Sequence, residues 1–201
     1  MNAEHVRDFG RILRRNEIQF VIVGGAAVRH FVPSESQDVD ALLLAKEYRR
    51  AVRAFDKDPA VVSFSDEAGE MATGHFHSRF RLVRFDLLNP GAFSGSRSGD
   101  EFFLYVARHG SVPTPDGRVA RVPIVWYMRL VIEGEAWQAQ VSKILRDLRA
   151  GAPWLQIGAV RRIAHRFDTA ERISQRLPIV ADAALRLGLL GGKRVDSVES
   201  D

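Results

Sequence analysis

Cysteine is absent from the 201 residues of this chain. Disulfide bonds and thiolate metal sites are therefore excluded, and we expect a reducing, cytoplasmic location. Long apolar stretches are also missing, since the longest, such as 20–23 and 41–45, are far too short to cross a bilayer. The N-terminal segment carries early charge and lacks the apolar region of a signal peptide. We therefore expect no membrane partner.

Lysine is scarce, so most of the 29 basic Lys and Arg side chains are arginines, and the sequence pI is about 9.8. The planar guanidinium suits phosphate groups, so a polyanionic partner is one interpretation. Solvated helix faces of an arginine-rich protein are the other. The motifs G-x-x-x-x-G-K-[S/T], G-x-S-x-G and H-E-x-x-H are also missing. Nothing therefore indicates a P-loop protein, an α/β-hydrolase or a zincin.

Hydrophobic periodicity divides the chain into a strand-rich part and a helical part. The expected strand regions are 17–23, 38–44, 60–64 and 75–88, with a hairpin at 111–123 that turns at Asp116-Gly117. The expected helices are 4–15, 26–31, 47–55, 126–133, 137–150, 155–167 and 169–187. Segments 65–73 and 89–100 have the composition of loops, the second a flexible one. This arrangement predicts an α+β core domain at 1–125, a helical subdomain at 126–190 and a disordered tail at 191–201.

Two acidic residues, Asp38 and Asp40, stand at the start of an apolar strand, with Val39 between them. Alternate side chains of a strand point to the same face, so the two carboxylates project side by side. Like charges this close repel each other unless a cation or a proton lies between them. Two carboxylate ligands are the usual beginning of a Mg²⁺ site, which substrate phosphate completes.

A third acid, Asp86, lies within the apolar strand segment R-F-D-L-L, where an unpaired charge is costly. It either forms an ion pair with Arg84 or Arg81, or joins the metal site and takes the proton from an attacking hydroxyl. Upstream, Gly24-Gly25 separates a strand from a helix. Backbone N–H groups and the missing Cβ favour an anion such as phosphate there.

Taken together, these motifs carry a family resemblance. The run V-I-V-G-G-A-A-V at 21–28, followed by D-V-D-A-L at 38–42 and F-D-L at 85–87, resembles the nucleotidyltransferase superfamily of DNA polymerase β-like proteins. Gly-Gly in place of Gly-Ser is more similar to the AbiEii-type toxins and related prokaryotic members than to minimal or aminoglycoside-modifying ones. The resemblance covers residues 18–90 and implies a nucleotidyltransferase-type mixed sheet flanked by helices.

The activity implied by the resemblance is transfer of NMP from an NTP–Mg²⁺ complex to an acceptor hydroxyl, with release of pyrophosphate. The implied site holds two metal ions, with Mn²⁺ as an alternative to Mg²⁺. By position, Asp38, Asp40 and Asp86 would hold the metals, and Asp86 would also act as the base. The implied nucleotide contacts are Gly24, Gly25, Ser36 and Lys143.

The resemblance extends in part to a later helix and fails in one place. Relatives often carry a Lys there with an Asp four residues on, and Lys143 and Asp147 have this spacing. The Lys would contact nucleotide phosphates; the alternative is an exposed salt bridge between the two residues. Just before the first acid, relatives have Arg-x-Thr, whereas this chain has S-E-S-Q at 34–37. A basic contact is missing there, which leaves the preferred nucleotide open.

The acceptor is not encoded in these motifs. One expectation is a toxin of a toxin–antitoxin or phage-defence pair that modifies tRNA, with a cognate antitoxin protein as partner and Arg161, Arg162 and Arg166 on the RNA backbone. The alternatives are transfer to a protein or to a small molecule such as an aminoglycoside, and a catalytically inactive nucleotide- or partner-binding module of the same fold. Because inactive members usually lose an acid, the three acids favour an enzyme.

Overall fold

The computed structural model describes residues 4–33, 36, 38–67, 69, 71–79 and 81–190. The helices are α1 (Glu4–Arg15), α2 (Gly24–Arg29), α3 (Ala45–Asp56), α4 (Gly99–Arg108), α5 (Val122–Val131), α6 (Ala136–Arg149), α7 (Ile157–Arg166) and α8 (Ala170–Arg186). The strands are β1 (Phe20–Val23), β2 (Val39–Leu43), β3 (Val61–Glu67), β4 (Met71–Ser78), β5 (Arg81–Leu88), β6 (Ser111–Thr114) and β7 (Gly117–Ala120). The predicted tail at 191–201 lies outside the described residues.

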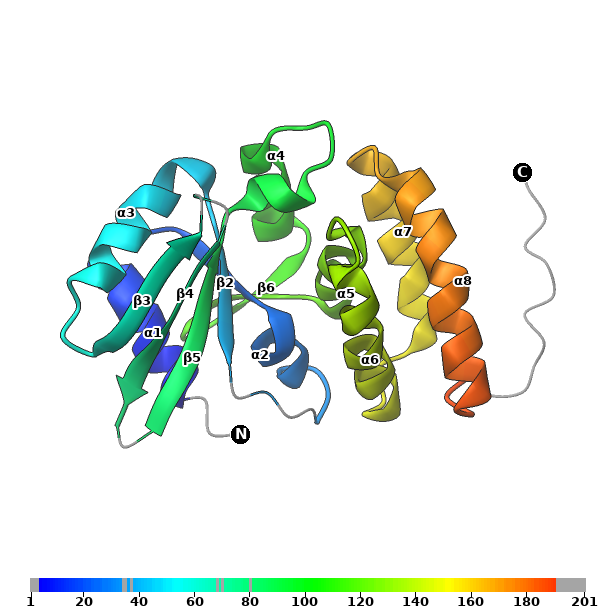
Figure 1. The fold of residues 1–201 in the computed structure, drawn as a ribbon, viewed down its shortest axis with the longest axis horizontal. Coiled ribbons are helices and arrows are strands. Elements are labelled where there is room, and N and C mark those ends of the chain that lie inside the picture. Colours follow the sequence, from blue (N-terminus) through cyan, green and yellow to red (C-terminus); the bar gives the residue numbers. More distant parts are fainter. Residues whose placement is uncertain are drawn as a thin grey trace.

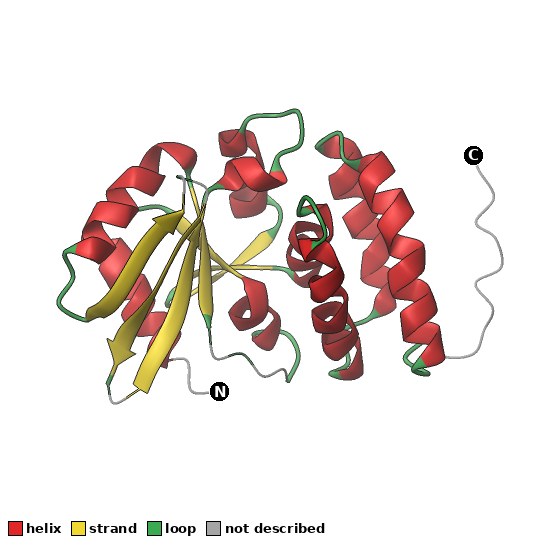
Figure 2. Cartoon of the chain, in the orientation of Figure 1, coloured by secondary structure: helices red, strands yellow, loops and turns green. Residues whose placement is uncertain are grey.

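The strands form one mixed sheet in the order β3-β4-β5-β2-β1-β7-β6 (Figures 1 and 2). An antiparallel meander, β3-β4-β5, occupies one end, and the predicted hairpin β6-β7 occupies the other. The parallel pairs are β2 with β5 and β1 with β7, whereas β1 and β2 are antiparallel. The predicted α+β class, a mixed sheet flanked by helices, is confirmed.

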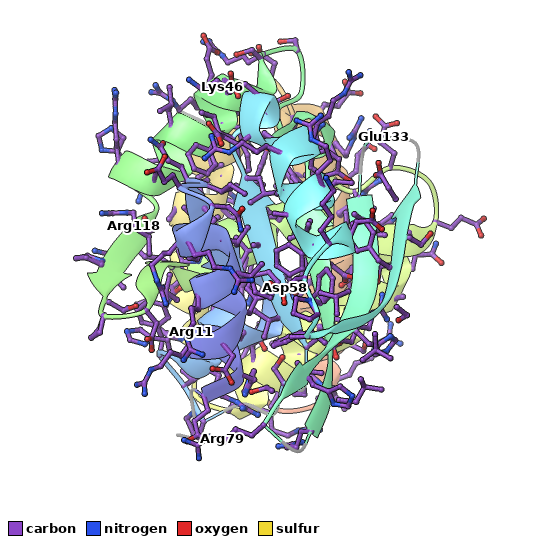
Figure 3. The ribbon with its side chains drawn as sticks, turned by 90° about the vertical axis from the view of Figure 1, so that its left-hand side faces the viewer. Arg11, Lys46, Asp58, Arg79, Arg118 and Glu133 are labelled. Carbon is purple, nitrogen blue, oxygen red and sulfur yellow. The ribbon has the colours of Figure 1, made fainter. Side chains whose placement is uncertain are left out.

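The meander packs one of its faces against α1 and α3. Four rings meet there, Phe9 from α1, Phe55 from α3, Phe76 from β4 and Phe85 from β5, with centroids 4.7 to 6.0 Å apart. Figure 3 looks at these two helices from outside. Because Phe85 points into this core, its neighbour Asp86 projects from the opposite face of the sheet.

Helices α5 to α8 pack together beside the sheet, as Figure 1 shows. Helix α2 contacts both β1 and α5, and it therefore joins the sheet to the helical part. Helix α5 starts at Val122, four residues before the position expected from the sequence. In the described part of the chain, no helix is long and apolar enough to cross a membrane. The division into domains at 125 stays a prediction.

Two segments differ from the sequence prediction. Segment 65–73, expected as a polar loop, contains the end of β3 and the beginning of β4. Its polar residues reflect a sheet with one face open to solvent rather than the absence of a strand. Segment 89–100 contains the 3-10 turn Pro90–Phe93 and the first residues of α4, a helix that the sequence reading did not predict. Ser98 caps α4 by accepting a hydrogen bond from the backbone N–H of Glu101 at 3.2 Å.

Candidate functional site

Three acids meet at the open face of the sheet. Asp40 of β2 and Asp86 of β5 are direct partners in the parallel register, so their side chains lie on the same face of neighbouring strands. Asp38 precedes β2 by one residue. All three line a cavity of about 1680 Å³ whose wall also includes residues of α5, α6 and α8. The structure thus brings together the three residues that the sequence singled out, although their roles stay a prediction.

The acids repel one another. Burial, then the charge of Asp86 and then that of Asp38 raise the pKa of Asp40 to about 7, while Lys143 and Arg129 act in the opposite direction. A carboxyl group with this pKa is partly protonated at neutral pH, because burial and the two neighbouring carboxylates outweigh the charges of Lys143 and Arg129. The arrangement favours an added cation.

The two glycines give the acids room. Gly24 has a φ of +64°, and a Cβ on it would lie 1.7 Å from Oδ2 of Asp40. A Cβ on Gly25 would lie 2.6 Å from Oγ of Ser36. Glycine is therefore required at 24 both for the backbone conformation and for the position of the Asp40 carboxylate. The predicted contact between these glycines and phosphate stays a prediction.

Ser36 lies in the cavity wall and donates a hydrogen bond to the backbone carbonyl of Asp38 at 3.1 Å. It therefore helps to fix the segment that leads into the acid pair. The other residues of the S-E-S-Q segment, Ser34, Glu35 and Gln37, lie outside the described residues.

Asp86 has a second neighbour on its own strand. Nη2 of Arg84 lies 3.4 Å from Oδ1 of Asp86, the ion pair that the sequence offered as an alternative. The Arg84 side chain is half exposed, and of these two residues it is Asp86 that lines the cavity. An exposed pair of this length is weak, so it does not prevent Asp86 from serving a cation or a hydroxyl group.

Lys143 and Asp147, four residues apart on α6, do not form the exposed salt bridge that the sequence offered as an alternative. Lys143 is exposed and lines the cavity. Asp147 is 1% exposed and forms an ion pair with Arg129 of α5, and it accepts a hydrogen bond from Nε1 of Trp126 at 2.9 Å. That alternative was wrong because the i,i+4 spacing places two side chains on one helix side without fixing their burial.

Four arginines of the described residues line the cavity, and the sequence predicts a site role for none of them. Arg146 follows Lys143 by three residues and lines the same wall, a position that helical spacing could have indicated. Arg129 is 6% exposed within α5. The one feature of the sequence that could have indicated its role is a charged residue within an otherwise apolar helix.

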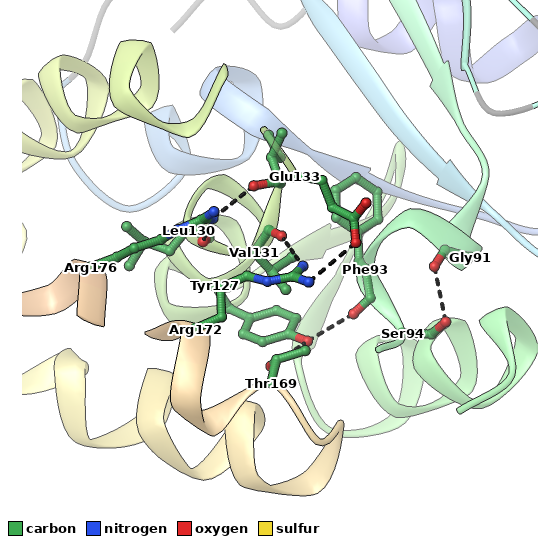
Figure 4. A network of polar contacts seen from close by, with 11 residues as sticks. Gly91, Phe93, Ser94, Tyr127, Leu130, Val131, Glu133, Thr169, Arg172 and Arg176 are labelled. Carbon is green, nitrogen blue, oxygen red and sulfur yellow. Dashed lines mark hydrogen bonds and ion pairs between the residues drawn. The ribbon is translucent and has the colours of Figure 1, made fainter. Parts of the chain in front are cut away.

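Two of the arginines in the cavity wall, Arg172 and Arg176 of α8, donate hydrogen bonds to backbone carbonyls of α5 (Figure 4). Arg172 donates to the carbonyl of Val131 at 2.8 Å, and Arg176 donates to that of Ile132 at 2.7 Å. Both carbonyls lie at the C-terminal end of α5, where they have no partner within the helix. These side chains are therefore engaged in joining α8 to α5.

The carboxylates fit a Mg²⁺ ion that arrives with a phosphate ligand. Among the described residues, no group of three or more His, Cys, Asp or Glu side chains is placed so as to hold a metal ion unaided. Mg²⁺ is commonly bound by only one or two carboxylates together with substrate phosphates and water. Asp40 and Asp86 are partners in the β2-β5 register, and Asp38 lies beside them. The nearby cations do not fully compensate the negative charge of these carboxylates, so they suit a Mg²⁺ ion that brings phosphate and water as its other ligands.

No family model matches the chain, and no curated protein matches it. Among solved structures, an antigenic nucleotidyltransferase-like protein from Paracoccidioides brasiliensis is similar at 12% identity and a TM-score of 0.44, over 85% of this chain and 90% of that one. The antibiotic-resistance factor ANT(2'')-Ia is similar at 11% identity and a TM-score of 0.43, over 93% of this chain and 96% of that one. Likenesses this weak carry no argument about function, which must rest on the residues of the cavity.

Proposed function

We propose that this protein is a Mg²⁺-dependent nucleotidyltransferase that moves NMP from an NTP to an acceptor hydroxyl and releases pyrophosphate. The observation that carries the proposal is the pairing of Asp40 with Asp86 across β2 and β5, beside Asp38, in a cavity that Lys143 also lines. Acids and a cation facing one cavity suit a substrate that combines a divalent metal with phosphate.

Each side chain has a distinct task in this proposal. Asp38 and Asp40 would hold the metal ions, and Asp86 would complete the site and accept the proton of the acceptor hydroxyl. When bound, Mg²⁺ would neutralise phosphate charge and make the α-phosphorus more open to attack by the hydroxyl; Mn²⁺ would serve in its place. Lys143 contacts the triphosphate, and the segment of Gly24, Gly25 and Ser36 lies beneath it.

The order of the strands suggests how the two substrates approach. Gly24 follows β1, which lies on one side of β2, whereas Asp86 belongs to β5 on the other side. The nucleotide would therefore lie toward β1 and α6, and the acceptor hydroxyl would arrive from the β4 side of Asp86. Thr73 and His75 of β4 are the direct partners of Asp86 and Arg84, so they lie on that approach.

We further propose tRNA as the acceptor and a toxin as the biological role, with a cognate antitoxin protein as partner. The support is chemical: Arg161, Arg162 and Arg166 are exposed on α7, and Arg84 is half exposed beside Asp86. Arginines suit phosphodiester groups better than they suit a cationic small molecule such as an aminoglycoside.

The test is incubation of the protein with each labelled NTP, Mg²⁺ and total tRNA. We expect label transfer by the wild type and at least a hundredfold loss in Asp38→Ala and Asp86→Asn. The matched control is Asp56→Ala, an exposed acid at the end of α3, which should retain wild-type activity. Absence of transfer with every nucleotide would refute tRNA as the acceptor, and full activity in Asp38→Ala would refute the proposed active site. NTP binding without any transfer would indicate an inactive nucleotide-binding module.

A further inference from the structure

Arg129 is a buried cation in the wall of the cavity. Its side chain belongs to α5, in which every other residue from Val122 to Val131 except Pro123 is buried and apolar or aromatic. Burying a charge costs several kcal/mol unless it is paired, and here the pairing comes from Asp147 on α6. Two apolar side chains would pack α5 against α6 at least as well. A buried ion pair that borders a cavity therefore points to a purpose beyond packing.

Asp147 is held in a single orientation. Its Oδ2 atom accepts from Nη1 of Arg129 and, at 2.9 Å, from Nε1 of Trp126. Its Oδ1 atom is enclosed and has no hydrogen-bond partner. Trp126 and Arg129 are three residues apart on α5, so the Asp147 carboxylate accepts hydrogen bonds from two neighbouring side chains on one side of that helix. Asp147 thereby fixes where the guanidinium of Arg129 stands.

Arg129 also belongs to the cavity wall. A guanidinium has five N–H donors, and the hydrogen bond to Asp147 engages one of its amino groups. Arg129 lines the same cavity as Asp40, Lys143 and Arg146. Its charge also acts on Asp40, where it favours the ionised carboxylate. Beside Arg172 and Arg176, which are bound to carbonyls of α5, the cavity wall thus contains the buried cation Arg129 and the exposed cations Lys143 and Arg146.

We propose that Arg129 binds a phosphate group of the polyphosphate ligand, and that Asp147 is the positioning residue that holds Arg129 for this contact. The identification of the ligand as an NTP rests on the proposed function, whereas the contact itself requires only a polyphosphate. A fixed guanidinium offers a planar, preorganised pair of donors, which a phosphate accepts better than it accepts a mobile ammonium.

Binding of inorganic tripolyphosphate, measured by titration calorimetry without acceptor or turnover, tests the contact. We expect Arg129→Gln to weaken binding at least about tenfold, the loss of one charge-assisted hydrogen bond. The matched control Arg53→Gln makes the same change at an exposed position of α3, outside the cavity wall, and should bind like the wild type. Equal binding by Arg129→Gln and the wild type would overturn the proposal.

A double-mutant cycle tests the positioning role. Asp147→Asn leaves Arg129 buried without its counter-ion, so we expect tripolyphosphate binding to weaken several-fold in the wild-type background and to be unchanged in the Arg129→Gln background. An equal effect in both backgrounds would show a structural role alone. Tighter binding would mean that Asp147 competes with the anion. Either result would overturn the positioning role.

Thermal melting checks that each variant is folded. If Asp147→Asn does not fold, Trp126→Phe removes only the indole donor to Asp147 and should give a smaller weakening, again dependent on Arg129. The outcomes separate this inference from the proposed function. Nucleotidyl transfer with tripolyphosphate binding unaffected by Arg129→Gln would refute the inference alone, and Arg129-dependent binding without transfer would refute the enzyme alone.

Discussion

At the scale of single residues, Gly24 shows how a residue without a side chain determines the place of a charged one. Its φ of +64° belongs to the left-handed region, and the space that a Cβ would fill is occupied by the Asp40 carboxylate. The sequence predicts a contact between Gly24 and phosphate, because a glycine before a helix often serves that purpose. The close approach of the Asp40 carboxylate is a second reason why residue 24 must be glycine, and it applies whether or not a phosphate binds.

Replacement of Gly24 by Ala should displace the Asp40 carboxylate. We expect Gly24→Ala to lower the free energy of unfolding by more than the roughly 1–2 kcal/mol of a left-handed alanine, because the clash adds to that strain. The control is Gly188→Ala, since Gly188 has a φ of +66° and no atom within 4 Å of the Cβ position. Chemical denaturation measures both. Equal losses in the two variants would show that the Asp40 contact is unimportant.

At the scale of elements, the hydroxyl of Tyr127 links segment 89–98 to the helical part, beside the hydrogen bond that Ser96 donates to Asp168. Tyr127 of α5 donates a hydrogen bond to the carbonyl of Phe93 at 2.8 Å and accepts one from Thr169 at 3.2 Å (Figure 4). Nearby, a Cβ on Gly95 would lie 1.9 Å from the carbonyl oxygen of Phe167. The segment is therefore packed against the corner between α7 and α8, rather than standing free as its composition predicted.

Tyr127→Phe should loosen this junction. It leaves the buried Phe93 carbonyl without its donor, and we expect a loss of about 1–3 kcal/mol in the free energy of unfolding. Tyr105→Phe is the matched control: Tyr105 packs against Phe167 in the same ring cluster, with centroids 5.5 Å apart, and its hydroxyl makes no hydrogen bond among the described contacts. Denaturant titrations of both variants provide the measurement, and a Tyr127→Phe variant as stable as the control would contradict the proposed junction.

Elements with strong local signals could be predicted from the sequence. Helix α1 was placed at its observed bounds, and the Asp116-Gly117 turn located the β6-β7 hairpin. The acid pair and Asp86 were found because charge in an apolar strand is costly enough to stand out. Helix α4 was missed because its capping signals lie next to a loop-like composition. The burial of Asp147 could not be predicted, since it depends on how α6 packs against α5.

At the scale of the whole molecule, the acids of the cavity lower the free energy of unfolding by an amount that depends on pH. The folded protein holds the pKa of Asp40 near 7, mainly through burial and the charge of Asp86. In the unfolded chain the same group ionises near its ordinary value of 3.8. Between these values the folded state keeps a proton that the unfolded state releases. The free energy of unfolding therefore falls as the pH rises from about 4 to about 7, and the contribution of Asp40 is constant above that range.

Asp40→Asn should remove this cost, because a neutral amide of similar shape neither ionises nor repels Asp86. We expect the variant to be more stable than the wild type at pH 8 by up to about 4 kcal/mol, at 1.36 kcal/mol per pKa unit, and the difference to vanish toward pH 4. Denaturant titrations at both pH values provide the measurement. Asp56→Asn, at the exposed end of α3, carries the same change of charge and should follow the wild-type curve. A constant offset between Asp40→Asn and the wild type from pH 4 to pH 8 would show that Asp40 does not titrate in this range. A stability gain confined to high pH, combined with loss of transfer activity, would identify Asp40 as a residue kept for chemistry at the expense of the fold.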